Sequence, residues 1–225
     1  MEQQDRTTKQ DMVAIPFQCE TSMVVAGPSQ VGKTSFVLKL IKHKGQMYSP
    51  TTPDGILYCY SSEQSALDEA ERTIPNFILH RGLPTLETIA AAGIHPLVIL
   101  DDLMAQALSS SDVTALFTKE VHHRHFTLIF IMQNVYEQGK KARSIALNTQ
   151  YLVLFRNPRD VTQLMTLGKQ MFPRQPQRIV EAMEDITAED PRGYLIIDNT
   201  CTAKEDYRLR TKVFPQEDPI LYTRV

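Results

Sequence analysis

Short apolar runs alternate with longer amphipathic segments along this chain of 225 residues. The runs SMVVA (22–26), LVIL (97–100), TLIFIM (127–132) and YLVLF (151–155) are apolar at successive positions, as in strands buried on both faces of a parallel sheet. Between such runs, apolar residues recur at helical spacing, and KTSFVLKLIK (33–42) places its apolar residues on one side. The alternation predicts an α/β fold in which helices cover both faces of a parallel sheet.

The same pattern places the individual elements and the domain boundaries. We expect strands at 22–26, 56–60, 77–79, 97–100, 127–132, 151–155, 194–197 and 209–213. We expect helices at 33–42, 65–72, 86–91, 113–121, 141–147, 161–170 and 178–184. No linker rich in Gly, Ser or Pro divides these elements. We therefore predict an N-terminal arm (1–21), one domain (22–214) and a C-terminal tail (215–225).

Composition narrows the class of protein. Hydrophobic residues make up 42% and charged residues 22%, which indicates a folded globular chain. The formal net charge of −2 excludes a histone-like basic coat but not a local basic patch. The three cysteines show no CxxC spacing, which argues against a disulfide scaffold or a zinc ribbon and favours a reducing compartment. No segment resembles a signal peptide or a membrane span, so we expect an intracellular protein without a membrane partner.

The segment from Gly27 to Thr34, GPSQVGKT, matches the phosphate-loop pattern GxxxxGK[ST] in full. It follows an apolar strand and opens a helix, so backbone N–H groups and the helix N-terminus can surround phosphate oxygens. Lys33 would reach the β- and γ-phosphates, and the Thr34 hydroxyl would bind Mg²⁺. The predicted cofactors are therefore ATP and Mg²⁺. The residues that we assign to nucleotide binding are Gly27, Pro28, Ser29, Gln30, Val31, Gly32, Lys33, Thr34 and Ser35.

Two adjacent carboxylates, Asp101 and Asp102, end the apolar strand at 97–100. Strand ends of an open parallel sheet form its ligand crevice, so two acids there suggest a metal site beside the triphosphate. Asp101 would bind Mg²⁺, through water, and Asp102 would orient or deprotonate the attacking water. The alternative is a helix cap after the strand. Many ATPases of this kind carry Glu where Asp102 stands, and Asp is one methylene shorter.

The strand at 127–132 ends in a polar residue, Gln133, that could sense the γ-phosphate or hold the attacking water. An ordinary polar strand end is the alternative. Arg143, Arg156 and Arg159 follow in the sequence. An arginine offered to the ATP of a neighbouring subunit would stabilise the transition state, although a solvated surface position is the default for each.

Four segments together carry a family resemblance: GPSQVGKTSF, LVILDDLM, LFTKEVHHRHFTLIFIMQN and RSIALNTQYLVLFRNPRD. In this order they resemble the FtsK/HerA superfamily, and more narrowly the genome-packaging ATPases of Maverick/Polinton elements and adintoviruses, relatives of the poxvirus-type packaging ATPase. The resemblance runs from about Ser22 to Phe214.

The resemblance implies a RecA-like P-loop NTPase core that assembles into a homo-oligomeric ring and moves double-stranded DNA into a capsid. It implies catalytic roles for Lys33, Asp102 and Gln133, with Arg143 as the first candidate for the trans-acting arginine. Capsid proteins become candidate partners. The expected location is the host cytoplasm or nucleus, or the virion.

Two other functions remain open on the sequence. A nucleoside or nucleotide kinase would share the phosphate loop and the size, but it should carry an arginine-rich lid and an acceptor pocket. A non-catalytic module would bind ATP only to drive assembly. The paired acids and Gln133 favour a hydrolase over the kinase. The assembly module stays open because Asp102 stands where many ATPases carry Glu.

Overall fold

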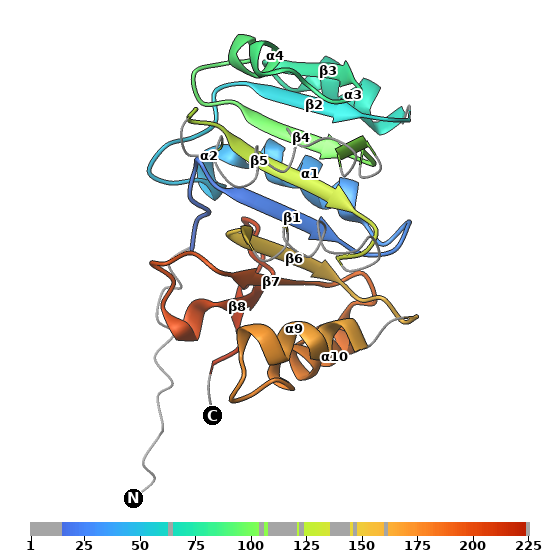
Figure 1. The fold of residues 1–225 in the computed structure, drawn as a ribbon, viewed down its shortest axis with the longest axis vertical. Coiled ribbons are helices and arrows are strands. Elements are labelled where there is room, and N and C mark those ends of the chain that lie inside the picture. The colour runs from blue at the N-terminus through green and yellow to red at the C-terminus, as the bar shows by residue number, and fades with distance from the viewer. Residues whose placement is uncertain are drawn as a thin grey trace, which may run out of the picture.

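The structure is a computed structural model that describes residues 15–62, 65–103, 106–107, 121, 124–135, 145, 148–159 and 162–223. Within them, nine strands form one sheet in the order β3-β2-β4-β5-β1-β6-β7-β8-β9. Figure 1 shows this order from β3 to β8. The strands are β1 (Ser22–Ala26), β2 (Ile56–Tyr60), β3 (Phe77–Arg81), β4 (Leu97–Asp101), β5 (Thr127–Met132), β6 (Tyr151–Phe155), β7 (Tyr194–Asp198), β8 (Leu209–Thr211) and β9 (Ile220–Leu221).

Strands β1 to β6 pair in parallel, as the apolar runs predict. Every residue of β1, β4, β5 and β6 is buried, because helices cover both faces of this part of the sheet. Strand β3 forms one edge of the sheet, and only Phe77 of it is buried.

Strands β7, β8 and β9 differ from the predicted parallel sheet because they run antiparallel to their neighbours. The reason is that two helices, α9 (Thr162–Met171) and α10 (Arg178–Glu189), separate β6 from β7. A single helix between two strands carries the chain back to the opposite end of the sheet, so the next strand runs parallel to the first. A pair of antiparallel helices brings the chain back to the end at which β6 finished, so β7 starts there and runs antiparallel to β6. Asp198, the last residue of β7, therefore lies beside Tyr151, the first residue of β6.

Side chains alternate between the two faces of the sheet and build two apolar layers. Val98 and Leu100 of β4 join the layer covered by α4 (Leu86–Ala91), α9 and α10. Leu97 and Ile99 join the layer covered by α1 (Lys33–Lys42) and α3 (Ser65–Thr73). Helix α1 lies behind the sheet in Figure 1. Helices on both faces confirm the predicted architecture.

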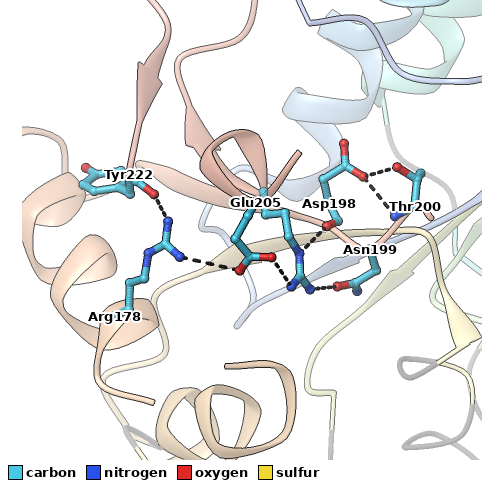
Figure 2. Close-up of polar contacts among 7 residues, drawn as sticks. Arg178, Asp198, Asn199, Thr200, Glu205 and Tyr222 are labelled. Carbon is cyan, nitrogen blue, oxygen red and sulfur yellow. Dashed lines mark hydrogen bonds and ion pairs between the residues drawn. The ribbon is translucent and has the colours of Figure 1, made fainter. Parts of the chain in front are cut away.

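A polar network holds the antiparallel part of the sheet together, at the end of β6 away from the phosphate loop (Figure 2). Arg208 donates to the carbonyl oxygen of Asp198 at 3.1 Å and to Oδ1 of Asn199 at 3.2 Å. The Glu205 carboxylate, in the short 3-10 helix Glu205–Tyr207, lies 3.5 Å from Arg208 and 4.0 Å from Arg178 of α10. A cavity of about 480 Å³ opens beside this network, lined by residues 171–175, Glu205 and Arg208.

The remaining predictions concern two helices that are only partly described, and the two ends of the chain. The predicted helices at 113–121 and 141–147 fall mostly outside the described residues. The short helix α2 (Lys44–Met47) was not predicted. Phe17 is buried against Tyr151, and β9 pairs with β8, so parts of the predicted arm and tail contact the domain. Among the described helices, none combines the length and the apolar character needed to cross a membrane.

Candidate functional site

Three sequence motifs meet at the carboxyl ends of three neighbouring strands. Strand β5 lies between β1 and β4, with Ala26 beside Met132 and Asp101 beside Ile131. The phosphate loop follows β1, the acidic pair ends β4, and Gln133 follows β5. The N–H of Gly27 donates to the carbonyl oxygen of Met132 at 3.3 Å, which joins the start of the loop to the tip of β5. Adjacent parallel strands are about 4.8 Å apart, so all three motifs face one crevice.

The backbone of the phosphate loop depends on its two glycines. Gly32 has a φ of 107°, in the left-handed region, and forms the N-cap of α1. Gly27 is buried against β6, and a Cβ placed on it would lie 2.6 Å from Cβ of Phe155. Gln30, at the exposed tip of the loop, also has a left-handed φ of 66°. These conformations direct the first N–H groups of α1 toward the space that the loop surrounds.

The Lys33 ammonium lies across its own loop. Its Nζ donates to the carbonyl oxygens of Gly27 and Pro28, both at 2.7 Å. The pKa of Lys33 lies below its ordinary value because burial outweighs the opposing effect of the Asp101 and Asp102 charges. Lys33 is therefore close to both acids, and phosphate oxygens could replace the two carbonyls as acceptors.

The remaining loop residues assigned to nucleotide binding differ in their exposure to solvent. Pro28, Val31 and Thr34 are half-buried, whereas Ser29 and Ser35 are exposed.

Asp101 is buried, and its carboxylate is held by a tyrosine that the sequence analysis did not single out. The hydroxyl of Tyr58, on β2, donates to Oδ2 of Asp101 at 2.6 Å. The Thr34 hydroxyl lies beside the same phenol oxygen. Burial, followed by the Asp101 charge, raises the pKa of the Tyr58 phenol, so this donor stays protonated. Thr34 and Asp101, the two residues assigned to the metal, thus lie beside one phenol.

Asp102 is exposed and adopts a left-handed backbone with a φ of 53°. Such a conformation is uncommon outside glycine, and it turns the chain sharply at the end of β4. Ser61, just after β2, donates to Oδ2 of Asp102 at 3.3 Å. Asp102 therefore lies at the mouth of the crevice, where its carboxylate can contact water.

Of the other predicted site residues, Gln133 is the one that the structure describes at the crevice. Gln133 is exposed at the tip of β5, beside the start of the phosphate loop. Arg143 lies outside the described residues. Arg156 donates to the Thr187 hydroxyl of α10 at 3.2 Å, within its own chain, and Arg159 lies in an exposed turn.

Three residues of the site were missed by the sequence analysis: Tyr58, Ser61 and Phe155. Tyr58 lies in the run ILYCY, which was interpreted only as a strand. A tyrosine in the middle of an otherwise largely apolar strand is a signal that could have identified it. Phe155 ends an apolar run, and no pattern in the sequence indicates that it supports the loop.

The donor set at the crevice fits Mg²⁺. This cation prefers oxygen ligands and is bound in phosphate sites by one or two protein oxygens, substrate phosphates and water. The Thr34 hydroxyl and the Asp101 carboxylate supply such oxygens, and both are near the Lys33 ammonium that would contact the same phosphates.

The sheet order and the crevice define an α/β P-loop NTPase fold with a RecA-like core. No protein-family model and no curated protein matches the chain. Similar solved structures include the genome packaging NTPase B204 from Sulfolobus turreted icosahedral virus 2 in three complexes. The sulfate complex aligns with a TM-score of 0.49 at 12% identity, over 91% of this chain and 97% of B204. The ATP-gammaS complex has a TM-score of 0.49 at 13% identity, over 85% and 95%. The AMPPCP complex has a TM-score of 0.47 at 14% identity, over 91% and 98%.

Proposed function

We propose that this chain is an ATPase that moves double-stranded DNA into the capsid of a virus or virus-like element. The observation that carries the ATPase part is the meeting of Lys33, Thr34, Asp101 and Asp102 in one crevice. The DNA-packaging part rests on the motif resemblance described above, and not on the likeness to B204. The expected partners are DNA, further copies of this chain in a ring, and capsid proteins. We expect it in the host cytoplasm or nucleus, or in the virion.

The residues of the crevice suggest how ATP would be bound. The triphosphate lies against the loop N–H groups, and Lys33 exchanges its two carbonyl acceptors for β- and γ-phosphate oxygens. The Thr34 hydroxyl and the Asp101 carboxylate would hold Mg²⁺, which would neutralise charge on the phosphates.

Hydrolysis then requires a positioned water molecule. Asp102, at the mouth of the crevice, accepts a proton from the water as it attacks the γ-phosphorus, and Gln133 orients that water. An arginine from the neighbouring subunit, with Arg143 as the candidate, stabilises the transition-state charge. Turnover is therefore coupled to assembly of the ring.

The first experiment is steady-state ATP hydrolysis with and without long double-stranded DNA. We expect hydrolysis that DNA stimulates and that Lys33→Ala abolishes, because the loop loses its charge on the phosphates. Lys42→Ala is the matched control, since Lys42 is exposed at the far end of the same helix. Phosphoryl transfer to a nucleoside without DNA stimulation would establish the kinase alternative. Nucleotide binding without turnover at every protein concentration, in the presence of DNA, would favour the assembly module.

Asp102→Asn separates binding from chemistry. We expect normal nucleotide affinity with hydrolysis reduced by about 10²–10⁴-fold, the usual contribution of a general base. Asp206→Asn serves as the control because Asp206 is exposed in the 3-10 helix at the other end of the sheet. Wild-type turnover in Asp102→Asn would remove Asp102 from the mechanism.

A further inference from the structure

Tyr58 is a buried side chain that lies beside both groups assigned to the metal. Its hydroxyl donates to Oδ2 of Asp101 at 2.6 Å and lies beside the Thr34 hydroxyl. The three groups come from β2, β4 and the start of α1, so the phenol connects segments that are far apart in the sequence.

The direction of these hydrogen bonds matters for a metal site. A hydroxyl that binds a cation through an oxygen lone pair must direct its hydrogen at another acceptor. The Tyr58 oxygen is available as such an acceptor for the neighbouring Thr34 hydroxyl, because the phenol hydrogen is already donated to Asp101. The same bond fixes the position of Oδ2 of the Asp101 carboxylate.

The position of the phenol is itself well determined. Tyr58 is fully buried, and its ring stacks on Phe77 of the edge strand with centroids 5.8 Å apart and planes inclined by 24°. A hydroxyl on a ring that cannot turn aside is a rigid support for the groups it contacts. Residues that orient metal ligands in this way typically change metal affinity by 10–100-fold when they are lost.

We propose that Tyr58 is a positioning residue of the magnesium site, which holds the Thr34 hydroxyl and the Asp101 carboxylate in their metal-binding orientations. This inference rests on the proposed nucleotide-binding function. It differs from a packing role, in which the phenol would stabilise the fold and leave the affinity for Mg²⁺ unchanged.

The test is equilibrium binding of fluorescently labelled ADP over a range of MgCl₂ concentrations, with an EDTA sample as the metal-free reference. In Tyr58→Phe we expect the MgCl₂ concentration for half-maximal effect to rise about 10-fold, while the affinity in EDTA stays at the wild-type value. Tyr58→Phe keeps the ring and its stacking on Phe77, and thermal unfolding verifies that the variant is folded.

Tyr48→Phe is the matched control. Tyr48 is also a buried tyrosine, and its hydroxyl has no hydrogen-bond partner among the described residues. We expect its magnesium dependence to equal that of the wild type. A Tyr58→Phe curve that coincides with the wild-type and Tyr48→Phe curves would overturn the inference.

A double-mutant cycle keeps the test decisive if Tyr58→Phe lowers stability. If Tyr58 acts through Thr34 and Asp101, its removal should have a smaller effect on magnesium dependence in a Thr34→Ala background than in the wild type. Equal effects in both backgrounds would overturn the positioning role. Failure of the wild-type protein to bind labelled ADP, with or without MgCl₂, would instead overturn the proposed function, and the inference with it.

Discussion

Gly27 illustrates how a single residue of the loop is constrained by a strand that the motif does not include. Its Cα faces β6 so closely that a Cβ would lie 2.6 Å from Cβ of Phe155 and 3.2 Å from Cγ2 of Val31. The Phe155 Cβ cannot move without moving β6, whose five residues are all buried. Gly27 is therefore required, because only a residue without a Cβ lets the loop lie this close to β6.

We predict that Gly27→Ala displaces the phosphate loop, costs about 1–3 kcal/mol of unfolding free energy, and weakens nucleotide binding at least 10-fold. Chemical unfolding and labelled-ADP titration measure the two effects. Gly45→Ala is the control, because a Cβ on exposed Gly45 has nothing within 4 Å, and alanine favours its helix. Unchanged stability and affinity in Gly27→Ala would contradict the prediction.

At the scale of elements, a buried ion pair joins β7 and β8, the first two antiparallel strands after the parallel core. NH1 of Arg210, on β8, lies 3.1 Å from Oδ2 of Asp198, at the end of β7, and the Arg210 side chain is 1% exposed. Its guanidinium also lies over the rings of Phe17 and Tyr151 at 5.5 and 5.9 Å. The pair thereby connects β6, β7, β8 and the segment before β1.

We predict that Asp198→Asn lowers the unfolding free energy by about 3–5 kcal/mol, because it leaves the Arg210 charge buried without its counter-charge. Asparagine preserves the shape and can still accept the hydrogen bonds that Thr200 donates to Asp198.

The matched control is Glu189→Gln, which breaks the exposed pair of Glu189 with Lys212 and should cost less than about 1 kcal/mol. Urea unfolding compares the two variants. Equal, small losses would show that the buried pair contributes no more than a surface pair.

At the scale of the whole molecule, the proposed motor needs contacts between subunits. The crevice of one chain contains the loop lysine and the acids, while Arg156 is engaged by Thr187 of its own chain. An arginine supplied by a neighbour would make hydrolysis depend on assembly, and Arg143 is our candidate for that role.

We predict that Arg143→Ala and Lys33→Ala are each inactive and that their mixture regains hydrolysis. In a ring assembled from equal amounts, about a quarter of the interfaces would pair an intact Lys33 with an intact neighbouring Arg143. The control mixture combines Lys33→Ala with Asp102→Asn, which should stay inactive because both residues belong to the crevice of one chain. An inactive Arg143→Ala and Lys33→Ala mixture would contradict a trans-acting Arg143.

Local patterns in the sequence predict most of the parallel core. The strands at 22–26, 56–60, 127–132 and 151–155 match β1, β2, β5 and β6 because a strand buried on both faces must be apolar throughout. The phosphate loop and the acidic pair are equally local, since each occupies consecutive positions. Their approach in space follows from parallel strands that all end at the same edge of the sheet.

The other features of the fold and the site depend on contacts between residues that are far apart in the sequence. The direction of β7 depends on whether α9 and α10 pack as an antiparallel pair, and helix periodicity carries no information about that packing. Helix α10 extends to Glu189, beyond the predicted end at 184, because Ile186 and Thr187 are buried against the rest of the domain. Tyr58 looks like any other strand residue until pairing of β2 with β4 brings its hydroxyl to Asp101. The sequence by itself determined which chemical groups the crevice contains, and the tertiary structure decided which buried side chains hold them, because a hydrogen bond across 43 residues leaves no local pattern.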